Sequence, residues 1–158
     1  MKTEHRRRLR ELVRAQRWAA LATVERGEPL ASMVAYALMP DASGFLLHLS
    51  RLAPHTRNLL KAGRASLAIS QNDPGEGDPQ TLERVSLLGP VQPVVRDGRD
   101  YVSLRACYLE RLPTAEPLFE FSDFVLFWVI VEEARYVGGF AQAFNLDAGE
   151  FVAAMRGS

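Results

Sequence analysis

Residues 48–67, HLSRLAPHTRNLLKAGRASL, decide how the chain folds, because they carry it out of one strand, through a short helix and into another strand. Pro54 fits the first position of a helix, Leu59 and Leu60 supply its inward face, and Gly63 is placed to end it. The runs FLLHLS at 45–50 and ASLAIS at 65–70 are typical of strands. The segment therefore predicts a strand–helix–strand unit.

The start of this helix is unusually rich in hydrogen-bond donors. Ala53 precedes Pro54 and cannot cap the backbone N–H groups of residues 55–57 with its side chain. A helix N-terminus surrounded by donors is an anion site. The segment thus indicates a phosphate-binding junction, with a solvated helix start as the alternative; the donors that surround it are Ser50, Arg51, His55, Thr56, Arg57 and Asn58.

Outward from this unit, strand-like runs are separated by short turns. WAALATVE at 18–25 and LASMVAYAL at 30–38 flank a hairpin turn, and PDASG leads into the strand at 45–50. Because a parallel crossover needs a dozen or more residues, we expect an antiparallel meander. The later elements are a polar loop at 71–80, a long strand at 81–95 bent at Gly89 and Pro90, a helix at 99–112, one or two strands at 124–140 and a last helical turn after Asp147.

The length suits one domain over residues 1–158, with an N-terminal helix at about 3–16 and a C-terminal tail at about 147–158. About six antiparallel strands with two or three helices describe a mainly β protein, a small barrel or a highly curved sheet. The 19 basic and 19 acidic residues balance, so neither nucleic acid nor a membrane is expected as a partner. Residues 1–17 are basic, and Leu9, Leu12 and Val13 at helical spacing favour an amphipathic helix over an arm that binds RNA or lipid.

The remaining composition points to a reducing compartment. A single cysteine, Cys107, excludes an internal disulfide and any metal site built from several cysteines. The first apolar run follows a charged segment, so no signal peptide is expected, and the apolar run at 124–131 is far shorter than the roughly 20 residues of a membrane span. We expect a cytoplasmic protein.

Several familiar catalytic sites are excluded by inspection. The chain has no G-x-S-x-G elbow, phosphate-binding G-x-x-x-x-G-K loop, H-E-x-x-H or C-x-x-C. His48 and His55 have no carboxylate beside them in the sequence, so no metal site is predicted. Catalytic residues stay unidentified, since Tyr36 and His48, the candidate proton donors, fit packing and the sheet surface better.

Four segments together resemble a known family. In chain order they are LATVERGEPLASMVAY, HLSRLAPHTRNLLKAGRASL, TLERVSLLGPV and FSDFVLFWVIVEEARYVGGFAQAF. They are similar to the FMN-binding split barrels related to pyridoxamine 5'-phosphate oxidase, and most of all to the haem-utilisation (HugZ-like) branch. The resemblance runs from about residue 10 to about residue 145 and implies a six-stranded antiparallel split β-barrel.

The resemblance also implies FMN as cofactor and a set of residues around it. Along the isoalloxazine ring it places Ser32, Met33, Val34 and Ala35. Around the phosphate and ribityl chain it places Ser50, Arg51, Leu52, His55, Thr56 and Asn58. Arg84 would lie near the polar edge of the flavin, and Gly139 and Phe140 would come from the second subunit of a homodimer.

The implied function is that of an FMN-dependent oxidoreductase, moving hydride or electrons between flavin and a small organic substrate. Pro54 and His55 stand where the oxidase pattern has arginine and lysine, and the end of the chain, NLDAGEFVAAMRGS, does not match the oxidase's substrate-binding segment, so vitamin B6 oxidation is not expected. One alternative is a haem-binding or haem-degrading protein with His48 or His55 as iron ligand, although no histidine follows His55. The others are a flavin-binding module without turnover, and RNA binding through Arg6, Arg7, Arg8 and Arg10.

Overall fold

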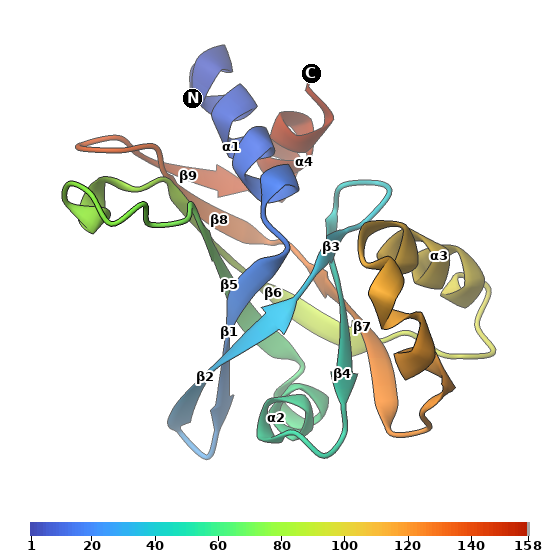
Figure 1. The fold of residues 1–158 in the computed structure, drawn as a ribbon. Helices are drawn as coiled ribbons and strands as arrows, with labels where there is room; N and C mark the ends of the chain where they lie inside the picture. Colours follow the sequence, from blue (N-terminus) through green and yellow to red (C-terminus); the bar gives the residue numbers. More distant parts are fainter. Residues whose placement is uncertain (158) are drawn as a thin grey trace.

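The strands form one curled antiparallel sheet that closes most of the way into a barrel (Figure 1). The computed structural model describes residues 1–157. Its strands are β1 (Trp18–Glu25), β2 (Glu28–Ala35), β3 (Ala37–Leu38), β4 (Gly44–Ser50), β5 (Arg64–Ser70), β6 (Arg84–Pro93), β7 (Phe124–Ile130), β8 (Glu133–Val137) and β9 (Ala143–Asp147). Its helices are α1 (Thr3–Ala15), α2 (Pro54–Ala62), α3 (Tyr101–Arg111) and α4 (Ala148–Arg156), with 3-10 helices η1 (Pro79–Thr81) and η2 (Pro113–Glu120).

The strand order β2-β1-β5-β6-β7-β4-β3 depends on a bend in β6. The first half of β6 pairs with β8 and its last residues pair with β7, while β5 follows its opposite edge. Gly89 lies between the two halves, where any Cβ would clash with the carbonyl of Ile130. The predicted bend at Gly89 is therefore confirmed, because only glycine allows the two backbones to approach so closely.

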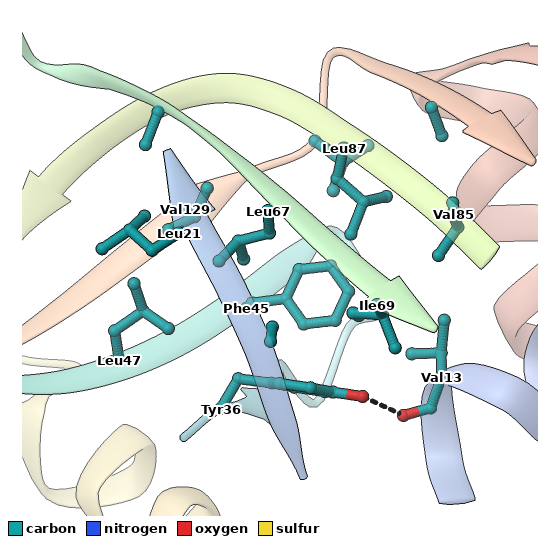
Figure 2. Close-up of a cluster of buried hydrophobic side chains, with 14 of the residues drawn as sticks. Val13, Leu21, Tyr36, Phe45, Leu47, Leu67, Ile69, Val85, Leu87 and Val129 are labelled. Atoms are coloured by element: carbon teal, nitrogen blue, oxygen red, sulfur yellow. Dashed lines mark hydrogen bonds between the residues drawn. The ribbon is translucent and has the colours of Figure 1, made fainter. Parts of the chain in front are cut away.

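The predicted three-strand meander is wrong. β2 pairs only with β1, β3 pairs with β4, and the chain crosses from one side of the barrel to the other at Tyr36. The Tyr36 ring is 1% exposed, packs edge-on against Phe45, and its hydroxyl donates to the Val13 carbonyl at the end of α1 (2.8 Å; Figure 2). Because this anchor is made with a remote helix, the local turn pattern does not contain it.

The mainly β class is confirmed, but the number of strands is not six. The apolar run at 124–140 divides into β7 and β8 at Val131 and Glu132, and β9 pairs with β8 in a hairpin that the pattern did not indicate. The helices at 3–15, 54–62 and 101–111 match their predicted ranges, and the tail forms α4. In the described residues, no helix is long and apolar enough to cross a membrane.

Two apolar clusters hold the molecule together. The first fills the barrel, where Leu21, Phe45, Leu67 and Phe127 meet (Figure 2 shows this cluster in part). The second lies on the other side of β4, beneath α3 and η2, and includes Leu46 and Phe119. β4 is therefore buried on both faces, which explains why its residues from Gly44 to Leu49 are all buried and all but His48 are non-polar.

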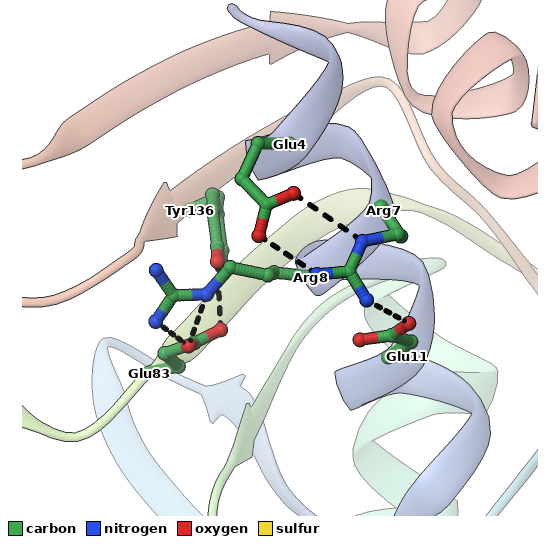
Figure 3. A network of polar contacts seen from close by, with 6 residues as sticks. All are labelled: Glu4, Arg7, Arg8, Glu11, Glu83 and Tyr136. Atoms are coloured by element: carbon green, nitrogen blue, oxygen red, sulfur yellow. Dashed lines mark hydrogen bonds and ion pairs between the residues drawn. The ribbon is translucent and has the colours of Figure 1, made fainter.

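The basic N-terminal segment is packed as a helix. Leu9, Leu12 and Val13 of α1 are buried, as predicted for an amphipathic helix. Arg8 reaches across to the buried carboxylate of Glu83 on the approach to β6, and that carboxylate also accepts a hydrogen bond from the Tyr136 hydroxyl (2.7 Å; Figure 3). α1 thus joins the sheet through charge as well as through apolar contacts.

Candidate functional site

The turn between β4 and α2 is held by Ser50 and Asp123. The Ser50 hydroxyl donates to Asp123 Oδ2 (2.6 Å) and accepts from the backbone N–H of Leu52 (3.2 Å). The Arg51 N–H donates to the Asp123 carbonyl (2.7 Å). Sequence reasoning missed Asp123, whose only signal is its place in FSDF, directly before β7. The Ser50 hydroxyl therefore makes its hydrogen bonds within the protein and stabilises the turn.

The start of α2 differs from the expectation that three N–H groups are left unpaired. Ala53 is the cap residue and makes no side-chain hydrogen bond, but its carbonyl accepts from the N–H groups of Thr56 (3.2 Å) and Arg57 (3.4 Å). In the described part of the chain, the His55 N–H has no such acceptor. One backbone donor stays free here, because the first turn tightens and pairs the others.

Two of the predicted site residues on α2 point into the barrel. Thr56 is fully buried and its hydroxyl has no hydrogen-bond partner among the described residues. Asn58 is 3% exposed; in the amide orientation that satisfies it best, it accepts from the Thr23 hydroxyl (3.1 Å) and donates to Glu25 Oε2 (3.1 Å). Asn58 therefore ties α2 to β1.

The side chains that face outward at this junction have mixed character. Arg51 is exposed, Leu52 is 78% exposed, and Arg57 donates from Nη1 to the Leu52 carbonyl (2.8 Å). His55 is half-buried, and burial lowers the pKa of its imidazole below the ordinary value. The His55 ring is thus biased towards the neutral form, which can accept a hydrogen bond or bind a metal.

β2 contributes an open edge beside this junction. It lies at the end of the strand order, pairs only with β1, and contacts both α2 and β4. Of its predicted site residues, Ser32 and Val34 face the same way as the buried Leu21 and Ala19 of β1, and Met33 faces outward at 49% exposure. The backbone groups along the free edge of such a strand are available to a ligand.

His48 lies on β4 but is unavailable to a ligand. Its ring stacks on Phe119 with centroids 3.7 Å apart and planes 5° from parallel, and Phe124 and Tyr108 pack around it. Burial, with smaller effects from Arg96 and Arg105, lowers the pKa of His48 to about 4. It is a neutral core histidine.

The remaining predicted residues lie at the opposite end of the sheet. α2 leads directly into the first residue of β5, whereas Arg84 pairs with Ser70, the last residue of β5. Arg84 Nη1 donates to the Gln80 carbonyl (2.9 Å). The β8–β9 loop, with Gly139 and the 86% exposed Phe140, follows Val137, which also pairs with Arg84 (Figure 1). Within one chain these residues do not meet the junction.

Sequence reasoning also missed the outer face of the sheet, where small side chains alternate with buried ones. β1, β2, β5 and β6 present on this face Trp18, Ala20, Ala22, Val24, Ala31, Met33, Ala35, Ser66, Ala68, Ser86 and Leu88, all exposed or half-buried. A hollow of about 470 Å³ opens further along it. Its lining includes Leu88, Glu133 and Arg135. The sequence signal for this face was the occurrence of alanine at alternate positions on neighbouring strands.

Comparison with known proteins identifies the family. Residues 2–153 match the family described as CREG, beta-barrel. The chain belongs to this family. A solved protein from Clostridium acetobutylicum, related to a general stress protein and of the pyridoxinephosphate oxidase family, has the same split-barrel fold, with a TM-score of 0.70, 16% identity, 96% of this chain and 99% of that chain covered.

Two proteins with higher sequence identity to this chain have descriptions that name haem. The non-canonical heme oxygenase HOZ, chloroplastic, of Arabidopsis thaliana is 37% identical over 125 residues, which are 79% of this chain and 36% of that protein. A heme binding protein from Mycobacterium smegmatis has a TM-score of 0.85 and 28% identity over 97% of this chain and 62% of that one. The chain therefore spans about a third of the first relative and less than two thirds of the second.

These relatives correct the cofactor and function inferred from the sequence. The family resemblance was right, but the predictions of FMN and of a flavin-dependent oxidoreductase are wrong, because the descriptions of the Arabidopsis thaliana and Mycobacterium smegmatis relatives name haem. The inference failed because split barrels share a scaffold across different cofactors, and fold does not fix the ligand.

Proposed function

We propose that this protein binds haem at the junction between β2, β4 and α2, and that it degrades haem when O2 and a reductant are supplied. The observation that carries the proposal is the 37% identity to a heme oxygenase over 79% of the chain. The structure of the Mycobacterium smegmatis heme binding protein, which matches over 97% of the chain, supports it. Because the chain spans only part of each relative, the activity is inferred for this scaffold and tested below.

His55 is the histidine best suited to bind the iron. Its pKa is lowered by burial, and no hydrogen bond or ion pair joins its ring to another described residue, so a neutral nitrogen is free. His48 is enclosed by Phe119 and Phe124, and therefore does not fit this role. Of the two histidines that the sequence left open as iron ligand, this contrast in burial supports His55.

The neighbours of His55 fit an amphipathic dianion. The exposed Leu52 offers an apolar contact for a porphyrin face, and the guanidinium groups of Arg51 and Arg57 can pair with its carboxylates. When bound, haem would supply an iron centre that reacts with O2; the protein's residues would bind it, orient it and limit the access of water.

We further propose that a homodimer completes the site. The outer face of the sheet carries alanine and serine beside the exposed Trp18 (57%) and Met33 (49%), a surface that can pack flat against a second copy. Phe140, 86% exposed at a loop tip, lies too far along the sheet to reach His55 in its own chain, and in a two-fold arrangement can meet the partner's junction. The homodimer therefore accounts for residues that one chain keeps apart.

A haem titration of purified protein tests the site. We expect one haem per chain with a Soret band, and His55→Ala should shift that band and weaken haem binding by at least about tenfold, the loss seen when even a supporting residue of a metal ligand is removed. His5→Ala is the matched control, because His5 is a partly exposed histidine on α1 that lies outside the junction. Equal spectra for wild type and His55→Ala would exclude His55 as the ligand.

Turnover is tested separately from binding. With O2 and ascorbate, the Soret band of the haem complex should decay and iron should become available to a chelator such as ferrozine. An intact Soret band, together with stoichiometric haem binding, would contradict degradation and leave a binding protein.

A further inference from the structure

A second cavity lies on the other side of the molecule from the β1–β2 hairpin, between the C-terminal ends of three helices. It has a volume of about 470 Å³, and its lining includes residues of α1, β3, α3 and α4. Figure 1 shows where these four elements lie in the fold. None of its lining residues belongs to the proposed haem site. The cavity is therefore a candidate for a second ligand site.

Three guanidinium groups line this cavity, each from the last turn of a helix. They belong to Arg14 of α1, Arg111 of α3 and Arg156 of α4. Among the described residues none forms an ion pair, and Glu110 is the one carboxylate in the lining. The cavity is therefore positively charged.

Each of these arginines uses only part of its hydrogen-bonding capacity. Arg14 Nη2 donates to the Met155 carbonyl (3.3 Å), and Arg156 Nη2 donates to the Asp41 carbonyl (2.8 Å). Arg111 Nη2 donates to the Arg14 carbonyl (2.6 Å). In the described structure, Nη1 and Nε of all three have no partner, although a guanidinium carries five N–H donors. Backbone contacts hold the groups in place and leave donors free for an anion.

The floor of the cavity is apolar. It is formed by Leu38, Met39 and Pro40, above the buried Val13 and the buried ring of Tyr36, whose hydroxyl is already bonded to the Val13 carbonyl. Cys107 lines the same space, and its thiol donates to the Leu38 carbonyl (3.4 Å). A ligand that fits this site needs an apolar body and an anionic end.

We propose that this cavity binds an amphipathic organic acid, whose carboxylate or sulfonate pairs with Arg14, Arg111 and Arg156 and whose aromatic or alkyl body rests on Leu38, Met39 and Pro40. The paired cations and apolar floor select such a molecule over inorganic phosphate, which gains nothing from the floor, and over an uncharged hydrophobe, which leaves the guanidinium groups unmatched. This site is separate from the haem site and does not depend on haem binding.

The test uses 8-anilinonaphthalene-1-sulfonate as probe and N-phenyl-1-naphthylamine as its uncharged counterpart. We expect the sulfonate to bind one site per chain and the uncharged compound to bind more weakly by about tenfold, the equivalent of a charge-assisted hydrogen bond. Cys107 reports where the probe binds, since it is the single cysteine of the chain. Its alkylation by iodoacetamide is measured by mass spectrometry. The reaction is run at about pH 8, because burial raises the pKa of the thiol, and it should slow when the probe is bound.

Two variants with opposite expectations guard against misfolding. Arg14→Gln with Arg156→Gln should weaken the sulfonate about tenfold or more, whereas Glu110→Gln should tighten it about threefold by removing a like charge. Glu110 is exposed and pairs with no described residue, so its substitution leaves the fold intact. Arg99→Gln, on an exposed loop, is the control and should change nothing.

Any of the following results of the probe experiments would overturn the proposal. They are equal affinity for the two probes, unchanged alkylation of Cys107 at saturating sulfonate, and unchanged affinity in Glu110→Gln. Stoichiometric displacement of the probe by haem would also overturn it, because the cavity would then be the haem site itself. Failure of haem binding at His55 leaves all of these measurements intact, so the two proposals are tested independently.

Discussion

At the scale of single residues, His48 makes stability depend on pH. Its imidazole is buried against Phe119, and its Nδ1 has no partner among the described residues. The pKa of His48 is lowered to about 4, from about 6.5 in an unfolded chain. Between these values the unfolded state binds a proton that the folded state does not, so the free energy of unfolding decreases as the pH falls, by up to about 3 kcal/mol.

The variant that checks this is His48→Leu, which keeps the site apolar and removes the titrating group. Urea unfolding of wild type at pH values from about 7 down to about 4.5 should show the loss, and the variant should lack this part of it. An NMR titration should place the His48 transition near pH 4. The same pH dependence in both proteins would show that other groups are responsible.

At the scale of elements, α1 depends on one buried carboxylate. Glu83 is 6% exposed and binds Arg8 of α1 and the Tyr136 hydroxyl of β8 together, and burial followed by this hydrogen bond raises the pKa of Tyr136 (Figure 3). Glu83→Gln should lower the free energy of unfolding by about 2 kcal/mol, because it leaves the guanidinium group of Arg8 without its charge partner. Hydrogen exchange should also become faster in residues 3–15.

Glu11→Gln is the matched control for this variant. Glu11 accepts a hydrogen bond from Arg7 (2.7 Å), but the two side chains are 58% and 50% exposed. Exposed ion pairs contribute little to the free energy of unfolding. We expect no measurable change in stability or in hydrogen exchange of α1. If the two glutamine variants behave alike, the buried network does not hold the helix.

Among these elements, the local features could be predicted from the sequence, whereas the contacts between remote segments could not. Pro54 and Gly63 bound α2 as expected, and Arg26 and Gly27, both with positive φ, form the hairpin turn, because these features are local. The pairing of β4 with β7 and the crossing at Tyr36 join remote parts of the chain, so no local pattern contains them. The burial of Glu83 was likewise invisible, since an isolated glutamate in a sequence is normally an exposed residue.

The candidate site was predictable in part for the same reason. The residues of the β4–α2 turn are neighbours in sequence, and the structure keeps them together. Arg84, Gly139 and Phe140 lie at the other end of the sheet, and only in the proposed homodimer would they meet this turn. The ligand itself could not be derived from spacing, because anionic groups of flavins and of haem meet the same donors.

At the scale of the whole molecule, the outer face of the sheet decides whether the site is complete. Ala22 is exposed on this face, paired with Ala31 of β2 and Ser66 of β5, and a much larger side chain there would hold the two sheets of the proposed dimer apart. Ala22→Arg should convert the proposed dimer into a monomer in sedimentation velocity, and weaken haem binding about tenfold through loss of the partner's loop. Val102→Arg is the control: Val102 lies on α3 and is 77% exposed, so its substitution should leave the oligomeric state and haem binding unchanged. If the wild-type protein is a monomer and still binds haem with the affinity expected of the dimer, one chain holds the whole site. Phe140 would then have another role.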